Sequence, residues 1–489
     1  MTAALLVLTP LLPIAIALCA LVPGLRAHVG RLALAAPVPG LLAALFAERG
    51  VTAELPGALL GVGLALDGIG GVFLGFAAFL WLAAGLFARA YMGAATPAFW
   101  GFWCATLAGS LGVFVALDAI TFYVAFAFVS LSAYGLVVHE GTFKALRAGR
   151  VYIVLAVFGE TCLLLGFMLG AAAADGIGIA EIRGALPDAP QRDLALALLL
   201  AGFGLKAGLV PLHVWLPLAH PAAPTPASAV LSGAIVKAGV FGLMRFLPLE
   251  AALPVWADIL VVGGLATAYY GVVVGLGQPN PKTILAYSTL SQMGLVIAVL
   301  GAGLGSPQVG LTLAVATLYA AHHGLAKGAL FLSVAVIGKS GARALPWAMA
   351  ATGLMAIAIA GLPLTGGALA KLAIKGPVGE GTAALLVTLS AIGTTLLMLR
   401  FLAAVRATAA DDLAARPPPG LLAPWLAVVV AALAVPWLLF PGLAERPAAY
   451  ALGLDAIWGG LWPILAALVI AALAFRRLRH DHPYLPEGD

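Results

Sequence analysis

The sequence predicts an all-α polytopic membrane protein with about 15 transmembrane helices, and three observations support this fold class. Of its 489 residues, 63% are hydrophobic and only 9% are charged, whereas a soluble protein keeps about a quarter of its residues charged. Apolar runs of roughly twenty residues, the length needed to cross a bilayer, follow one another along the whole chain. The runs contain many of the 59 glycines, as is typical of closely packed membrane helices. The alternative, a soluble bundle of long buried helices, lacks the charged residues for a wet surface.

We expect spans near 3–22, 27–47, 68–90, 98–117, 119–138, 151–173, 193–218, 226–247, 254–276, 283–303, 308–337, 346–376, 380–406, 421–441 and 456–475. The first run lacks a basic region before it and a small-residue cleavage site after it, so we interpret it as a span and not as a cleaved signal peptide. The second contains Pro37 and Pro39, which favour a break in a helix.

The basic residues of the loops predict the orientation of the chain. Of the 25 lysines and arginines, fourteen fall in loops on one side and six on the other, and the richer side is expected to face the cytoplasm. This places the N-terminus outside and the tail RRLRHDHPYLPEGD in the cytoplasm. Termini on opposite sides require an odd number of spans, which agrees with fifteen.

The remaining five basic residues lie within predicted spans: Lys206, Lys237, Lys327, Lys371 and Arg400. A charge inside the bilayer costs several kcal/mol and usually faces a polar pathway, so these residues are functional candidates. The alternative is that a side chain extends to the membrane surface. That interpretation fits Arg400 well and Lys371 in part, but it fits Lys237 poorly, because about eleven residues separate Lys237 from either end of its helix.

Two spans carry helix-breaking residues in mid-membrane, at 204–217 and 361–371, and each break lies next to a lysine. Broken helices at corresponding positions of two halves point to an ion path in inverted-repeat transporters. The expected organisation is three N-terminal helices (1–97), a first five-helix repeat (98–247), an inverted second repeat (254–406) and C-terminal helices with the tail (421–489). For either break alone, a packing kink is the alternative interpretation.

Several functions are excluded or disfavoured. Cys19, Cys104 and Cys162 lie far apart in apolar runs, so neither a disulfide framework nor a metal site is expected. The net charge of +5 comes from short loops between spans and does not indicate nucleic-acid binding. The glycine run 301–305 follows a membrane helix and not a strand, which argues against dinucleotide binding. The polar run of Ser288, Thr289, Ser291 and Gln292 either holds water or bonds across helices.

Four stretches resemble one family: 202–246 (GFGLKAGLVPLHVWLPLAHPAAPTPASAVLSGAIVKAGVFGLMRF), 286–301 (AYSTLSQMGLVIAVLG), 320–337 (AAHHGLAKGALFLSVAVI) and 361–375 (GLPLTGGALAKLAIK). They are similar to the antiporter-like, proton-translocating subunits of respiratory complex I, energy-converting membrane hydrogenases and Mrp antiporters, from about Asp67 to Arg406. The last stretch looks most like the hydrogenase-type and generic proton-conducting branch.

The resemblance implies a buried relay of protonatable groups that is driven by a partner. It assigns Lys206 to the first broken helix, Lys237 to the connection, His323 and Lys327 to the central relay, and Lys371 to the exit. Because His323 and Lys327 are four residues apart, they share one helix face. His213 is a candidate for the cytoplasmic end of the path and His322 for an auxiliary role, and for both the alternative is a structural hydrogen bond.

One position departs from the family. The family carries a glutamate in the fifth span, where this chain has Ala127. Glu160 lies ten residues past Arg150, so it is roughly 15 Å from that face of the membrane. Ala127 is roughly 13 Å from the opposite face, so both positions lie near the middle of a core about 30 Å thick. We therefore hypothesise that Glu160 replaces the missing carboxylate as the partner of Lys206. The alternatives are a protonated glutamic acid bonded within the packing, and a first half-channel that has been lost so that the subunit is partly a scaffold.

The sequence thus favours a proton-translocating subunit of a larger complex of the quinone oxidoreductase or hydrogenase type in the bacterial inner (cytoplasmic) membrane. We expect no cofactor or metal in this chain, since electron chemistry would belong to other membrane and peripheral subunits. The expected partners are these subunits, the lipid bilayer, and protons or Na⁺, but not nucleic acid. The alternative is a cation/proton antiporter or an ion-coupled module of inorganic-carbon uptake. An organic-solute transporter and a membrane-embedded enzyme are the remaining classes.

Overall fold

The structure is a computed structural model and describes residues 1–58, 61–93 and 96–477. The part of the predicted cytoplasmic tail from residue 478 onward lies outside the described residues. Within the described residues, twelve helices are long and apolar enough to cross a membrane. They coincide with twelve of the predicted spans, and the other three predicted spans, 27–47, 193–218 and 346–376, are each divided into shorter helices. The chain is therefore a multi-pass membrane protein.

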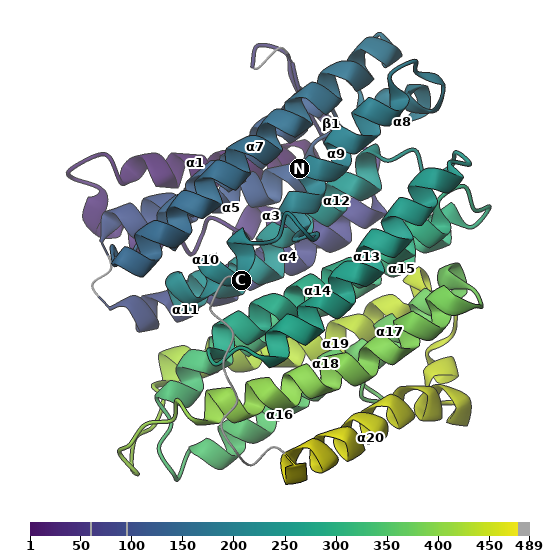
Figure 1. Ribbon diagram of the computed structural model, residues 1–489. Helices are drawn as coiled ribbons and strands as arrows, with labels where there is room; N and C mark the ends of the chain where they lie inside the picture. Colours follow the sequence, from purple (N-terminus) through teal and green to yellow (C-terminus); the bar gives the residue numbers. More distant parts are fainter. Residues whose placement is uncertain (59–60, 94–95, 478–489) are drawn as a thin grey trace. The chain divides into compact units, whose positions relative to one another are not determined.

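The chain packs as two compact units, and within each unit the long helices run side by side (Figure 1). The first unit contains residues 1–207 and 222–251, and the second contains residues 208–221 and the chain from 252 onward. The inverted repeats expected at 98–247 and 254–406 stay a prediction.

The helices of the first unit are α1 (Thr2–Cys19), η1 (Arg26–His28), α2 (Val29–Leu32), α3 (Val38–Phe46), α4 (Gly68–Met92), α5 (Pro97–Val115), α6 (Ala119–Val137), α7 (Phe143–Ala174), α8 (Ile179–Ala185), η2 (Leu186–Asp188), α9 (Arg192–Ala207), α11 (Thr225–Val230), η3 (Leu231–Ile235) and α12 (Val236–Phe246). An antiparallel hairpin of β1 (Thr52–Leu55) and β2 (Val62–Ala65) precedes α4. Asp67 caps α4 by accepting a hydrogen bond from Gly70 N at 2.7 Å, and Asp118 caps α6 in the same way from Thr121 N at 2.7 Å.

The segment 27–47 does not form one long helix. It consists of η1, the four-residue α2 and the nine-residue α3, with Pro37 immediately before α3 and Pro39 within its first turn. A proline has no N–H to donate and fits best at the start of a helix. The two prolines therefore explain why the helix begins anew at Val38.

The core of the first unit is filled by aromatic rings. Those of Phe122, Phe167, Phe203 and Phe246 contact one another with centroids 4.5–6.2 Å apart. They come from α6, α7, α9 and α12, so they tie these four helices together.

The helices of the second unit are nearly all of α10 (Trp215–Ala222), then α13 (Pro254–Leu276), α14 (Pro281–Gly303), α15 (Val309–Gly338), α16 (Leu345–Ala360), α17 (Gly366–Val378), α18 (Thr382–Arg406), α19 (Pro419–Leu443), η4 (Ala448–Leu452) and α20 (Leu454–Arg477). Glycines let α13 and α14 approach closely, because a Cβ added at Gly264 would lie only 2.5 Å from the carbonyl oxygen of Gly294. Nearly all residues of α14 and α15 are buried.

Both mid-membrane breaks lie at glycines with positive φ. Helix α9 ends at Ala207, Gly208 has a φ of +86°, and helical structure resumes at Trp215. Helix α16 ends at Ala360, Gly361 has a φ of +106°, and α17 begins at Gly366. Glycine adopts this left-handed conformation without steric cost, so the two positions favour an end to the helix.

Candidate functional site

Three of the lysines that lie within spans are deeply buried. Lys206 is 3% exposed, and Lys237 and Lys327 are fully buried, whereas Lys371 is partly exposed. A long cationic side chain is rarely buried in full unless it has a partner. The surroundings of each lysine therefore decide what it can do.

In the first unit, Lys206 of α9 lies among groups from α6 and α7. Its Nζ lies 5.3 Å from the ring centroid of Phe126 and 5.9 Å from that of Tyr152, within the range of cation–π contacts. The carboxylate of Glu160 on α7 is 7% exposed, is within electrostatic reach of Lys206 and lies beside the hydroxyl of Ser130. The structure thus brings together the two residues that the sequence hypothesis pairs.

Helix α6 contributes Phe126 and Ser130 to the surroundings of Lys206, and it also contains Ala127, the position where the family has a glutamate. Phe126 and Ser130, one turn apart on α6, bracket Ala127. The hydroxyl of Tyr152 on α7 donates to the carbonyl oxygen of Ser130 at 2.8 Å and holds the two helices in place. Helix α6 itself carries no Asp or Glu, and Glu160 of α7 lies within electrostatic reach of Lys206.

Lys237 lies one helix further along the chain, next to a local change of helix type. The turn η3, Leu231–Ile235, is π-helical, and Nζ of Lys237 donates to the carbonyl oxygen of Ser232 within it at 2.6 Å. A π-turn widens the helix and interrupts the usual ladder of backbone hydrogen bonds, and such turns are frequent at functional sites. This turn was not predicted from the sequence.

In the second unit, His323 and Lys327 lie one turn apart on α15, and both are fully buried. Nζ of Lys327 donates to the carbonyl oxygen of Leu285 on α14 at 3.0 Å. The predicted common face of His323 and Lys327 therefore lies in the interior of the unit, against α14.

His322 faces a different neighbour, the start of the second broken helix. A Cβ added at Gly366 would lie 2.6 Å from its Nδ1, and one at Gly367 would lie 3.0 Å from its Nε2. The imidazole thus packs directly on the first turn of α17, which only glycine permits. Lys371 follows on the same helix and is close enough for its charge to act on His322.

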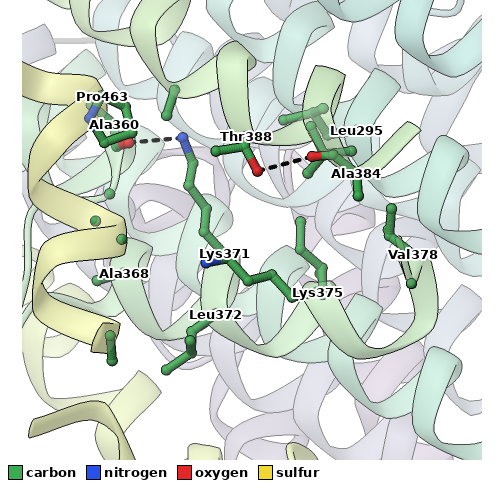
Figure 2. A pocket seen from close by; sticks show the side chains of 18 residues that line it. Leu295, Ala360, Ala368, Lys371, Leu372, Lys375, Val378, Ala384, Thr388 and Pro463 are labelled. Atoms are coloured by element: carbon green, nitrogen blue, oxygen red, sulfur yellow. Dashed lines mark hydrogen bonds between the residues drawn. The ribbon is translucent and has the colours of Figure 1, made fainter. Parts of the chain in front are cut away.

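Lys371 lines a cavity of about 250 Å³ in the second unit (Figure 2). Its Nζ donates to the carbonyl oxygen of Ala360, the last residue of α16, at 2.8 Å. The C-terminal end of a helix carries partial negative charge, so this position suits an ammonium group. Lys375, Thr388 and Leu295 line the same cavity (Figure 2).

His213 follows the break after α9 and is 4% exposed, and its ring centroid lies 4.9 Å from that of Tyr270. The nearby His220 is fully buried and stacks on Phe331 at 4.5 Å. His220 was not predicted as a site residue from the sequence, although it lies in the same stretch, 202–246, as the predicted His213.

Within the part of the chain that the structure describes, no group of three or more His, Cys, Asp or Glu residues is placed to hold a metal ion. The arrangement provides protonatable nitrogens buried in each unit and hydrogen-bonded to protein oxygens. Such groups can take up and release protons.

Comparisons with known proteins give a consistent result. The sequence matches the family described as "NADH:quinone oxidoreductase/Mrp antiporter, TM" over residues 116–397. Hydrogenase-4 component B of Escherichia coli is 34% identical over 56% of this chain and 44% of its own length. NADH-quinone oxidoreductase subunit N of Desulforudis audaxviator is 31% identical over 64% of this chain and 65% of its own length. The chain thus spans about half to two thirds of these relatives.

The fold is also found in a solved structure. A chain of the Mrp complex from a Dietzia species superposes with a TM-score of 0.79 and 24% identity, over 97% of this chain and 57% of that one. The family match covers more than half of the sequence and includes Lys206, Lys237, Lys327 and Lys371. This chain belongs to the NADH:quinone oxidoreductase/Mrp antiporter transmembrane family.

Proposed function

We propose that the chain is a proton-translocating, antiporter-like membrane subunit of a larger complex, of the quinone oxidoreductase or hydrogenase type. The observation that carries this proposal is the burial of Lys206, Lys237 and Lys327 inside a multi-pass membrane protein. A buried ammonium group is expensive, and within a membrane it usually marks an ion path. Relatives named as a hydrogenase component and a quinone oxidoreductase subunit support the type of complex.

The proposed relay assigns one role to each group. Lys206 and Glu160 form the switch in the first unit, Lys237 the connection, His323 and Lys327 the central relay, and Lys371 the exit. Burial in an apolar surrounding disfavours a charged ammonium and so makes proton release easier, whereas a nearby carboxylate opposes release. A change in the charge or position of Glu160 would therefore change the proton occupancy of Lys206. His213 is proposed to line the cytoplasmic end of the path, and His322 to couple α15 to α17.

The proposed partners are other membrane and peripheral subunits, which carry any electron chemistry. The proposed location is the bacterial inner membrane, with the N-terminus outside and the C-terminus in the cytoplasm, following the distribution of basic loop residues. The transported ion is proposed to be H⁺.

Proton uptake by inverted membrane vesicles tests the proposal. The vesicles come from cells that express the full chain together with the subunits that co-purify with it in mild detergent. Lys237→Met and Lys327→Met are each expected to lower the initial rate of proton uptake by about tenfold or more. Lys339→Met is the control, because Lys339 is an exposed residue just beyond α15. Wild-type rates in both buried variants would refute the proposal.

A sodium/proton antiporter is the second candidate, supported by a relative from Staphylococcus aureus named a putative antiporter subunit, 31% identical over 64% of this chain. Uptake of radioactive sodium in the same vesicles separates the two candidates. Sodium uptake that needs Lys327 and opposes proton movement would favour the antiporter. Proton uptake that is indifferent to sodium would favour the first candidate.

A further inference from the structure

Three arginines line one cavity of about 360 Å³ in the first unit. Arg26 belongs to η1 and Arg31 to α2, the short helices that follow α1, and Arg89 lies in the last turn of α4. The indole ring of Trp100, in the first turn of α5, lines the same cavity. Separate parts of the chain thus bring cationic groups to one place.

The positive charges around this cavity have no partner of opposite charge in the described part of the chain. No carboxylate among the described residues forms an ion pair with Arg26, Arg31 or Arg89. Every residue that lines the cavity lies within 1–47 or 68–117, and neither stretch contains an Asp or a Glu. Guanidinium groups around one space repel one another. An anion in the cavity would relieve this repulsion, so the lining favours a negatively charged ligand.

Arg31 and Arg89 have hydrogen-bond donors to offer such a ligand. Both are exposed, and neither side chain donates a hydrogen bond to another described residue. Arg26 is held in place, because its Nε and Nη2 donate to the carbonyl oxygens of Ala20 and Leu21 at 3.1 and 3.5 Å. These bonds occupy oxygens that would repel an anion, and they leave the Nη1 group of Arg26 available.

The start of α5 adds to the positive potential of the cavity. Pro97, the first residue of this helix, lines the cavity, and no side chain caps the helix. The uncapped N–H groups of a first helical turn carry partial positive charge and favour an anion. Trp100 is 5% exposed, and a Cβ added at Gly30 would lie 2.8 Å from its indole nitrogen. The glycine therefore lets this ring form a wall of the cavity.

The cavity lies at the level where membrane spans end. Helices α4 and α5 are both long and apolar enough to cross a membrane, and the cavity is lined by the last turn of one and the first turn of the other. Arginine and tryptophan are typical of this level, where lipid headgroups lie. Leu86, one turn before Arg89 on α4, is 43% exposed. A lipid whose headgroup occupies the cavity therefore has an apolar surface on α4 for an acyl chain.

The chemistry of the lining distinguishes between kinds of lipid. Guanidinium groups bind phosphate oxygens through pairs of N–H···O bonds. A zwitterionic headgroup would also bring an ammonium group close to three arginines, with no carboxylate in the lining to pair with it. A phospholipid with a net negative charge avoids this repulsion.

We propose that this cavity binds the phosphate group of an anionic phospholipid, with Arg31 and Arg89 as its principal ligands and with Arg26 and Trp100 as the walls that position it. The bound lipid joins α2 to the ends of α4 and α5 and so stabilises the N-terminal helices. None of the buried lysines lines the cavity, so this inference does not depend on the proposed function.

Thermal unfolding of the purified complex, washed free of lipid in detergent, tests the site. Titration with phosphatidylglycerol is expected to raise the unfolding temperature until the site is saturated. Phosphatidylcholine with the same acyl chains, and inorganic phosphate at the same concentration, are expected to have little effect. Arg31→Gln and Arg89→Gln are each expected to weaken the apparent affinity for phosphatidylglycerol by about tenfold or more. Arg147→Gln is the matched control, because Arg147 is also an exposed arginine, near the start of α7, and does not line this cavity.

Misfolding is controlled by the unfolding temperature without added lipid. It is expected to equal that of the wild type in both variants, since neither Arg31 nor Arg89 bonds to another described residue. An unchanged affinity for phosphatidylglycerol in both variants would overturn the proposal. Equal shifts with phosphatidylcholine, which would indicate binding of the acyl chains alone, would also overturn it, as would an equal shift with inorganic phosphate, which would indicate a site for a free anion.

An acidic segment of another subunit is the remaining occupant to be tested. In that case the wild-type complex would not respond to phosphatidylglycerol, and the double variant Arg31→Gln, Arg89→Gln would lose that subunit during purification. This pair of results would replace the lipid by a protein partner and overturn the proposal. A double variant that keeps all of its subunits and loses only the response to phosphatidylglycerol supports the lipid site.

Discussion

Replacing Glu160 by glutamine removes the negative charge from the cluster around Lys206 while keeping the shape of the side chain. Glu160 is 7% exposed and Lys206 3%, so water screens their interaction little. For any two unit charges about 6 Å apart, Coulomb's law with an effective dielectric constant of about 20 gives an interaction of about 3 kcal/mol, and we take this as the scale of the effect. That energy corresponds to a change of about a hundredfold in the equilibrium between charged and neutral Lys206.

Because the proposed switch depends on this equilibrium, Glu160→Gln is expected to lower proton uptake in inverted vesicles by about tenfold or more. Glu140→Gln is the control, since Glu140 is an exposed carboxylate beyond the end of α6. The double variant Ala127→Glu, Glu160→Gln returns a carboxylate to the α6 position that the family uses. It is expected to recover most of the lost rate. Full activity in Glu160→Gln would refute the proposed switch between Glu160 and Lys206. A double variant that folds but does not recover the rate would show that the place of the carboxylate matters as well as its charge.

Three further predictions concern stability and are measured by thermal unfolding of the purified complex. Asp67 caps α4 and pairs with Arg245 through two hydrogen bonds of 2.6 Å, and its side chain is half exposed. Asp67→Ala is therefore expected to lower the free energy of unfolding by about 1–2 kcal/mol. Asp67→Asn keeps the cap and is expected to lower it by about half as much. Burial raises the pKa of Asp67, yet the hydrogen bonds and charge of Arg245 outweigh it and hold the pKa below its ordinary value. The stabilisation is fully present above about pH 4, the pKa of an aspartate in the unfolded chain, and is lost as the pH falls through the lower pKa of Asp67 in the folded protein. Asp67→Asn should remove this dependence of stability on pH. Gly367→Ala is expected to lower the free energy of unfolding by about 1–3 kcal/mol, because the added Cβ would clash with the carbonyl oxygen of Ala358 and with His322. Gly376→Ala on the same helix is the control: its Cβ would meet only ordinary van der Waals contacts, so the free energy of unfolding should hardly change.

The parts of this molecule that the sequence predicts well are those that depend on local composition. Span positions follow from apolar length, and the burial of Lys237 follows from its distance to either helix end. That Glu160 lies within electrostatic reach of Lys206 was expected from their depths along neighbouring helices, since each residue adds a fixed rise. Its role as the partner of Lys206 stays a prediction. The division of 27–47 was signalled by its prolines.

What the sequence could not provide depends on contacts between residues far apart in the chain. The hydroxyl of Tyr319 donates to Gln292, 27 positions away, and the amide of Gln292 donates to Thr394, 102 positions away. Each looks like an ordinary polar residue until the register of α14 against α15 and α18 is known. The π-turn at Leu231–Ile235 was hidden for a related reason, because its residues are compatible with ordinary helix and its stabilisation comes from packing.

The partners of the lysines explain why one site is better suited to control than the others. Lys237, Lys327 and Lys371 each donate to a backbone carbonyl oxygen, of Ser232, Leu285 and Ala360. A neutral amine still has N–H groups to donate, so each of these bonds survives the loss of the proton. A carbonyl dipole also favours the charged form less strongly than a full negative charge does. Such lysines can therefore pass a proton with little rearrangement. Lys206 lies within reach of the charge of Glu160, so in the proposed mechanism its proton occupancy responds to the state of that carboxylate, and this response is what a partner subunit can drive.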